Sequence, residues 1–487
     1  MQVDIGRTNW NYIRERDPKL LTFKDRYYGP AYEFILLRLT DSLDTRQMYL
    51  ARHLYNFLFF FAGVVAFFWL ARRLFSSSWM ALMASLCLVL SPRIFADSFY
   101  NTKDIPFMVV FIFAISTLVL FIKRPGWGIS ILHGAVSAFL IAIRVSGILI
   151  PMLTWVFLSA RWVLQLRPGK IVLREILAGL IYLIFILGLT TLFWPILWHD
   201  PLSEFFGALN EMSHYPYGND VLYLGHLLNP NQPPWHYIPI WISISTPLLY
   251  LVCFGLGVMT MLADLIRQPG KLFEGKKRDN LIILTCFFGP VLAVILLRST
   301  LYNAWRQMFF IYPPFLLIAV QGMRSVIHFL GHRLRPFVLY PVLVISLAVG
   351  LSDPAIFMVR NHPFENVYFN RLAGENMAQI KQRFELDYWG LAFKQGVDYI
   401  LKFDPGNIIP IYVTPPGIYY INYLLPDILQ DRLVVKDSPN QARYFVGSYV
   451  FRPEEYPYKK KIYSIDVDGA SLLSVFDLRV EPDNQSK

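Results

Sequence analysis

Ten apolar stretches separated by short polar loops constrain this chain more than any other feature of its sequence. Each is long enough, or nearly so, to cross the hydrocarbon core of a bilayer, which is about 30 Å thick. Only 16% of the 487 residues are charged, whereas soluble proteins carry about 25%. We therefore predict a polytopic α-helical membrane protein of about ten spans, at residues 53–71, 79–93, 105–122, 127–143, 147–160, 176–198, 236–262, 281–297, 309–323 and 336–352.

The basic residues between the apolar stretches predict the orientation. One set of alternate loops contains sixteen Lys and Arg residues, and the other set contains five. Because cytoplasmic loops retain basic residues, we expect both ends of the chain to lie outside the cytoplasm, in a multi-pass protein of the inner (plasma) membrane. The first fifty residues have no charged segment followed by an apolar one, so we expect neither a signal peptide nor an N-terminal anchor.

Three domains follow from this pattern: an extracytoplasmic first loop at 1–50, a transmembrane domain at 51–352 and an extracytoplasmic α/β domain at 353–487. The last domain shows no nucleophile-and-base pair and no glycine-rich phosphate loop, so we interpret it as a support or acceptor-facing domain. Asp468-Gly469 is a hairpin turn signal within it. We expect a helix at 389–403 and a second, short helix that follows Pro415-Pro416-Gly417 and ends at Leu425. Strands are expected at 408–413, 443–451, 462–467 and 471–478.

Composition argues against several classes of function. The net charge of +11 is spread between the apolar stretches, so we expect no nucleic-acid partner. The three cysteines lie inside apolar stretches without paired spacing, which predicts neither a disulfide framework nor a zinc site. His199 and Asp200 begin a polar loop at 199–235 that has no fixed ligand spacing, so solvated loop polarity is favoured over metal binding there. We assign no metal ligand, and a divalent cation stays open as a cofactor.

Five basic residues lie at the outer ends of predicted spans, where the positive-inside rule disfavours them: Arg93, Lys103, Arg144, Arg298 and Arg306. A cation held at such a place usually has an anionic partner. The alternative is snorkelling to the interface, which we favour for Arg93 and Arg298. Arg144 is the only charge between residues 131 and 158. Because guanidinium binds phosphate through paired hydrogen bonds, Arg306, which lies near Tyr302, is a candidate ligand for a lipid-linked phosphate.

The loop at 91–106 is the densest polar segment between two apolar stretches. Asp104 lies at its end, where a carboxylate could deprotonate or orient a hydroxyl acceptor or help to bind a metal. Alternatively, Asp104 caps a helix that begins at Ile105. Asp97 shares a helical face with Asp104 only if this loop is helical. Farther along, His236 lies among interfacial aromatic residues, where membrane anchoring and sugar stacking are both open.

Four motifs follow one another along nearly the whole chain. They are Ser91-Pro92-Arg93 through Lys103-Asp104-Ile105-Pro106, Tyr302-Asn303-Ala304-Trp305-Arg306 followed by Ile311-Tyr312-Pro313-Pro314, His362-Pro363 with Val367-Tyr368-Phe369-Asn370, and Asp387-Tyr388-Trp389-Gly390. In this order they resemble motifs of the GT-C glycosyltransferases, and the closest branch looks like bacterial relatives of the dolichyl-phosphate-mannose protein mannosyltransferases.

The resemblance implies a GT-C-like fold and an inverting transfer of a hexosyl or pentosyl group from a polyprenyl-phosphate carrier to a lipid, glycan or protein acceptor at the outer membrane face. In this family an acid in the first outer loop is the base, a second acid in the next outer loop assists, and basic side chains hold the phosphate. Asp104 matches the second acid. We assign Lys103, Arg144 and Arg306 to phosphate binding, and we assign substrate binding to Asp97, Asn101, His199, Asp200, His236 and Tyr302.

The start of the sequence departs from the family pattern. The family begins with one further helix that is followed by an Asp-Glu pair, and residues 3–7 here resemble the segment just after that pair. The helix and the pair would therefore fall before Met1, and Asp4 is the nearest substitute for the catalytic acid. Two other hypotheses stay open: a transporter or flippase for the lipid carrier, and a catalytically inactive membrane-bound relative.

Overall fold

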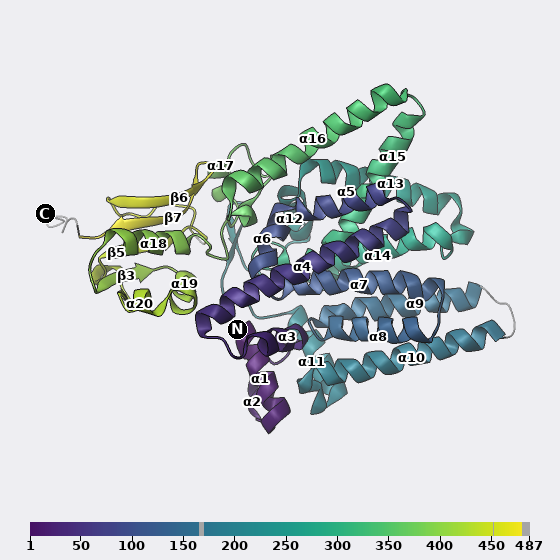
Figure 1. The fold of residues 1–487 in the computed structure, drawn as a ribbon, viewed down its shortest axis with the longest axis horizontal. Helices are drawn as coiled ribbons and strands as arrows, with labels where there is room; N and C mark the ends of the chain where they lie inside the picture. The colour runs from purple at the N-terminus through teal and green to yellow at the C-terminus, as the bar shows by residue number, and fades with distance from the viewer. Residues whose placement is uncertain (165–169, 451, 480–487) are drawn as a thin grey trace.

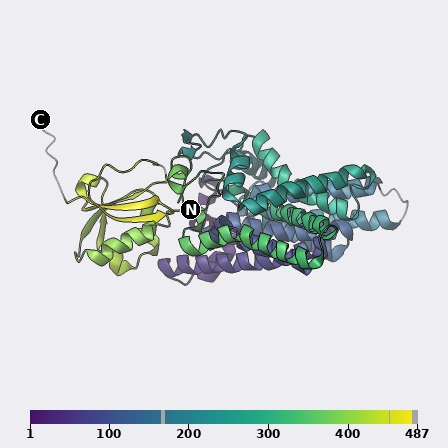
Figure 2. The same ribbon diagram turned by 90° about the horizontal axis from the view of Figure 1, so that it is seen from above.

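A computed structural model describes residues 1–164, 170–450 and 452–479 of the chain. A helical bundle forms most of the molecule, and a smaller sheet domain lies at one end of it (Figures 1 and 2). The bundle contains α4 (Thr45–Phe75), α5 (Ser78–Val89), α6 (Pro92–Tyr100), α7 (Asp104–Lys123), α8 (Trp127–Ile141), α9 (Leu149–Leu164), α10 (Lys170–Phe193), α12 (Tyr237–Ser245), α13 (Leu248–Arg267), α14 (Gly275–Leu296), α15 (Tyr312–Gly331) and α16 (Pro336–Asn361).

Each predicted apolar stretch corresponds to helix in the structure, which confirms the polytopic α-helical fold. Among the described residues, eight helical segments are long and apolar enough to cross a membrane. The pair α5 and α6, bent by 67°, gives a ninth, and α8 is a shorter apolar helix of 15 residues. The expected continuous helix at 236–262 is wrong, because the chain breaks between α12 and α13 at Pro247. Proline has no N–H to donate within a helix.

The segments expected as outer loops contain regular structure that the sequence analysis missed. Residues 1–50 form α1 (Gln2–Glu15), α2 (Lys19–Thr22), α3 (Ala31–Thr40) and the start of α4. The loop at 199–235 holds α11 (Pro201–Ser213) and an antiparallel pair of strands, β1 (Val221–Tyr223) and β2 (His226–Leu228). Short 3-10 turns lie at Val145–Ile148, Pro195–Trp198, Pro269–Lys271, Arg306–Ile311, Glu365–Val367 and Pro439–Gln441.

The C-terminal domain is a five-stranded mixed sheet with helices, which confirms the predicted α/β class, although only four of the five strands were predicted and β4 was missed. The strand order is β4-β3-β5-β7-β6, with β3 parallel to β4 and β5 and the other pairs antiparallel. Asp468 and Gly469 turn the β6–β7 hairpin with φ of 45° and 86°. The elements are α17 (Met377–Lys381), α18 (Phe393–Phe403), β3 (Ile409–Val413), α19 (Gly417–Leu424), α20 (Asp427–Gln430), β4 (Leu433–Val435), β5 (Tyr444–Ser448), β6 (Lys461–Val467) and β7 (Ala470–Asp477).

Helices α13 and α15 pack with their backbones in close approach. A Cβ atom added at Gly257 would lie 1.9 Å from the carbonyl oxygen of Ile318, and one added at Gly322 would lie 1.9 Å from the carbonyl oxygen of Cys253. Within a membrane, small residues drive helix association because they allow such close packing. These two glycines therefore fix how α15, which begins near the site described below, crosses α13.

We predict that Gly257→Ala destabilises the protein by about 1–3 kcal/mol, because the new methyl group must displace backbone of α15. Gly255, two residues earlier on the same helix, has no atom within 4 Å of an added Cβ, so Gly255→Ala is the matched control and should be neutral or slightly stabilising. Thermal unfolding of the purified protein in detergent measures both. Equal transition temperatures for the two variants would contradict this account of the helix crossing.

Candidate functional site

Asp104 is a buried carboxylate that two arginines from distant parts of the chain contact. Arg144, in the turn after α8, donates from Nη1 to Oδ1 of Asp104. Arg306, at the start of the turn that leads into α15, donates from Nη1 to Oδ2 at 2.9 Å. The side chain of Asp104 is only 2% exposed. A carboxylate at this depth needs such partners, since an unpaired buried charge costs several kcal/mol.

The loop before Asp104 is helical, which brings Asp97 to the same site. The Asn101 amide donates to Asp97 at 2.8 Å and to Asp104 at 3.0 Å, so one side chain joins the two carboxyl groups. The Asn101 oxygen also accepts the backbone N–H of Asp104 at 2.9 Å. Asp104 is itself the first residue of α7, so the prediction that it caps a helix starting at Ile105 is wrong. We call Asp97, Asn101, Asp104, Arg144 and Arg306 the Asp104 cluster.

Aromatic rings hold the Arg306 guanidinium in place. It lies 5.1 Å from the ring centroid of Tyr302 and 5.2 Å from that of Trp389, distances at which a cation is attracted to the π face. The ring of Tyr302 stacks on that of Tyr217, with centroids 4.0 Å apart. The indole of Trp389 donates to Asp97 at 3.2 Å. Trp389, from the C-terminal domain, therefore contacts both the acidic and the basic side of the cluster.

Lys103 lies beside the cluster. Its Nζ donates to the carbonyl oxygen of Gly29 at 2.9 Å and lies 4.9 Å from the ring centroid of Tyr28. Burial and the neighbouring Arg144 lower the pKa of Lys103 to about 7. Three basic side chains and the Asp104 carboxylate thus gather in one place, with an excess of positive charge.

The proposal that Arg93 snorkels to the interface is wrong. Arg93 is 3% exposed, its Nε donates to the carbonyl oxygen of Tyr368 at 3.0 Å, and its guanidinium lies 4.4 Å from the ring centroid of Phe369. Arg93 therefore fastens α6 to the chain segment that leads into the C-terminal domain. Arg298, by contrast, is exposed, in agreement with a location at the interface.

Glu385 is a buried acid that sequence reasoning missed. It is 1% exposed, and burial raises its pKa to about 8, although backbone N–H groups of Ala304 and Leu222 and the charge of Arg306 oppose this shift. Its neighbour Phe384 forms a β-bridge with Tyr223, which places Glu385 beside β1. A single Glu in a domain without catalytic motifs carries no spacing signal, so only the packing reveals it.

Several predicted substrate-binding residues make contacts of their own instead of joining the cluster. Asp200 caps α11 by accepting the backbone N–H of Ser203 at 3.2 Å. His199 lies 3.6 Å from Glu204, and Nδ1 of His236 lies 2.7 Å from the hydroxyl of Tyr223. Tyr302 does reach the cluster, through Arg306. Within the described ranges, no three His, Cys, Asp or Glu side chains are grouped closely enough to hold a metal ion.

Two motifs of the family resemblance hold loops together. Asn370 donates to the carbonyl oxygens of Ser243 and Thr246, both at 2.6 Å, and so satisfies backbone groups freed at the break between α12 and α13. Asp387 accepts from the Asn366 side chain at 3.0 Å and from the backbone N–H of Ala392 at 2.9 Å. These bonds fix the segment that presents Trp389 to the cluster.

A cavity of about 1160 Å³ adjoins the cluster, between α4, α6 and the C-terminal domain. Tyr100, Tyr388 and Trp389 line the side nearest the cluster, and aromatic residues of α19 line the other side. Asp4 also lines this cavity, and its carboxylate contacts the Met1 amino group at 2.7 Å. Trp389 is therefore a wall shared by the cavity and the Asp104 cluster.

The raised pKa of Glu385 predicts how stability changes with pH. Because the folded pKa of about 8 lies above the ordinary value of 4.5, the folded state binds this proton more tightly, and stability falls as the pH rises from about 4.5 to about 8. Glu385→Gln is neutral at every pH and should lose part of this slope in thermal unfolding. Glu375→Gln, an exposed acid in the same segment, is the control. Identical slopes for all three proteins would contradict the burial of a protonated Glu385.

Comparison with known proteins supports the fold. No family model and no curated protein matches the sequence. The crystal structure of ArnT from Cupriavidus metallidurans in the apo state is similar, with a TM-score of 0.51 and 14% identity over 97% of this chain and 92% of that one. A second ArnT structure from this organism, bound to undecaprenyl phosphate, has a TM-score of 0.45 and 14% identity over 92% of this chain and 87% of that one. The chain is thus a polytopic helical membrane protein with an ArnT-like fold and a C-terminal sheet domain.

Proposed function

We propose that this protein is a glycosyltransferase that moves a sugar from a polyprenyl-phosphate carrier to a lipid, glycan or protein acceptor. The reaction takes place at the outer face of the inner membrane, where residues 1–50 and the C-terminal domain also lie. The observation that carries the proposal is the contact of Arg144 and Arg306 with the single buried carboxylate of Asp104. Such a site can exchange one anion for another: a phosphate that binds the two guanidinium groups leaves Asp104 free to act on the acceptor.

The proposed reaction uses these groups as follows. An acceptor hydroxyl oxygen attacks the anomeric carbon from the face opposite the phosphate, and the bond between that carbon and the phosphate oxygen breaks. Its electron pair leaves with the polyprenyl phosphate, whose growing negative charge Arg144 and Arg306 stabilise. The hydroxyl proton passes to a carboxylate, and we assign the role of this base to Asp104. Attack from the opposite face inverts the anomeric configuration.

The cavity beside Trp389 is the proposed binding site of the acceptor. The cavity is lined by aromatic residues and has a volume of about 1160 Å³. It can therefore hold an acceptor molecule that has apolar faces. Asn101 and Asp97 lie on the side of Asp104 that Trp389 reaches, where they can orient the acceptor hydroxyl. Asp4 lies in the same cavity and stays the predicted substitute for the acid of the family's first outer loop.

The two other hypotheses have less support. A flippase is expected to carry ionisable groups along a path through the middle of the membrane. Here His133, buried in α8, is hydrogen-bonded to Thr117 and Thr154 at 2.8 and 2.9 Å, which favours a structural role. In a catalytically inactive relative, no reaction would require a buried carboxylate that contacts two arginines. The activity assay below separates an enzyme from both.

Transfer of labelled sugar from a polyprenyl-phosphate donor by the purified full chain tests the function. We predict that Asp104→Asn lowers kcat by about 100-fold or more, because the carboxylate no longer accepts the proton. Arg144→Gln and Arg306→Gln should raise KM for the donor and lower kcat, each by about tenfold or more, because each variant loses a charge-assisted hydrogen bond to the phosphate, whose negative charge grows in the transition state.

Arg298→Gln is the matched control, because Arg298 lies in the same outer loop as Arg306 but is exposed. It should leave kcat and KM unchanged. Size-exclusion profiles and thermal unfolding show whether each variant remains folded. Full activity in a folded Asp104→Asn variant would overturn the assignment of Asp104, and no transfer from any donor tried with wild-type protein would favour an inactive relative.

A further inference from the structure

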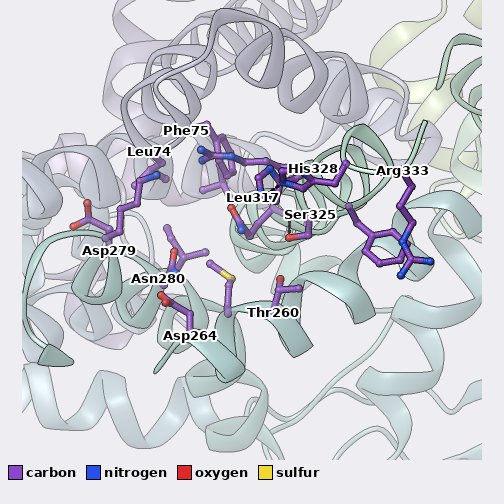
Figure 3. Close-up of a pocket in the computed structure, with 17 residues that line it drawn as sticks. Leu74, Phe75, Thr260, Asp264, Asp279, Asn280, Leu317, Ser325, His328 and Arg333 are labelled. Carbon is purple, nitrogen blue, oxygen red and sulfur yellow. Dashed lines mark hydrogen bonds between the residues drawn. The ribbon is translucent and has the colours of Figure 1, made fainter. Parts of the chain in front are cut away.

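A second cavity lies at the end of the bundle opposite the Asp104 cluster. It has a volume of about 690 Å³ and is lined by the last residues of α4 and by parts of α13, α14 and α15 (Figure 3). Arg306 precedes α15, and the cavity is lined by residues between Leu317 and Arg333, in the later part of this helix and just after it. A helix of 20 residues is about 30 Å long, so the two sites face opposite sides of the membrane.

Among the residues that the structure describes, the basic side chains of this cavity have no acidic partner. Lys276, Arg324 and Arg333 line it, and in the described part of the chain none of the three forms an ion pair. The two acids that also line it are already engaged. Asp279 is paired with Arg278 at 2.6 Å, and Asp264 is 3.8 Å from Lys277, whose Nζ also bonds the Asp264 carbonyl oxygen at 2.6 Å.

Further polar groups converge on the same space. His328 and His332, one turn apart on α15, bring their Nε2 atoms within 3.2 Å of each other. Ser325 and Asn280 also line the cavity and add neutral hydrogen-bonding groups, as Figure 3 shows. Three cations together with neutral donors form a set suited to a phosphate group, which accepts several hydrogen bonds at once.

The walls of the cavity are partly apolar. Leu74 and Phe75 of α4 and Leu317 of α15 line it (Figure 3). Phe329 also lines the cavity and is 54% exposed. Its ring centroid lies 4.4 Å from the Arg333 guanidinium. A soluble inorganic anion gains no binding energy from contact with these apolar side chains. A ligand that joins a phosphate to hydrocarbon chains matches both halves of the cavity.

We propose that this cavity binds the phosphate of an anionic phospholipid from the leaflet opposite the Asp104 cluster, with Lys276, Arg324 and Arg333 around the headgroup and an acyl chain beside Phe329. Retention of basic residues in cytoplasmic loops explains the positive charge of this face in general. It does not explain why these three cations, unlike Arg73, Arg267 and Lys271 on the same face, line one cavity whose acids are paired elsewhere. The site is independent of the proposed transferase activity.

Native mass spectrometry of the detergent-purified full chain, titrated with dioleoyl phosphatidic acid, tests this site. We expect one tightly bound lipid, and we expect the combined variant Lys276→Gln, Arg324→Gln and Arg333→Gln to bind it at least about tenfold more weakly. The control replaces Arg73, Arg267 and Lys271 by Gln, which removes the same charge from the same face outside the cavity. It should bind the lipid as the unmodified protein does.

Two further arms distinguish the source of the phosphate. Dioleoyl phosphatidylcholine has the same chains but no net charge and should bind at least about tenfold more weakly, and inorganic phosphate at equal concentration should not displace phosphatidic acid. Displacement by inorganic phosphate would overturn the lipid assignment in favour of a soluble anion. An equal loss of affinity in the cavity and control variants would overturn the site itself, provided that both variants unfold at the temperature of the unmodified protein.

Discussion

The burial of Asp104 between Arg144 and Arg306 is the interaction on which the arrangement of the outer end depends. A carboxylate at this depth is tolerated only with cationic partners, so the turn after α8 and the turn before α15 must both reach the start of α7. Trp389 extends the constraint to the C-terminal domain, because its indole contacts Asp97 and Arg306 together. One electrostatic requirement therefore joins four segments that no hydrophobic pattern would bring together.

A second constraint comes from breaks in the helices near this end. Where α12 gives way to α13 at Pro247, backbone carbonyl groups lose their helical partners, and unsatisfied groups are costly within a membrane. Asn370 supplies the missing donors, and Arg93 binds the carbonyl oxygen of Tyr368 close by. Of the motif residues, Asn370 thus serves to satisfy the backbone at a broken helix, whereas Asp387 binds the Asn366 side chain and the backbone N–H of Ala392 before α18.

Most of the fold and part of the site could be predicted from the sequence. The apolar stretches give the positions of the bundle helices, and the Asp468-Gly469 signal gives the β6–β7 hairpin. Charge at the ends of spans singled out Asp104, Arg144 and Arg306. The same reasoning misjudged Arg93, because sequence does not distinguish a cation at the interface from one buried against Phe369. It missed Glu385, whose unusual state arises only from the chain segments packed around it.

The sequence by itself determined that the chain resides in a membrane, where its helices run and which polar residues lie at their ends. These properties depend on local runs of residues, because hydropathy and turn signals act over a few positions. Only the tertiary structure decided which polar residues meet. Asp104 is 40 residues from Arg144 and 202 residues from Arg306, and contacts over such separations depend on how whole helices cross, as at the glycine contacts of α13 and α15.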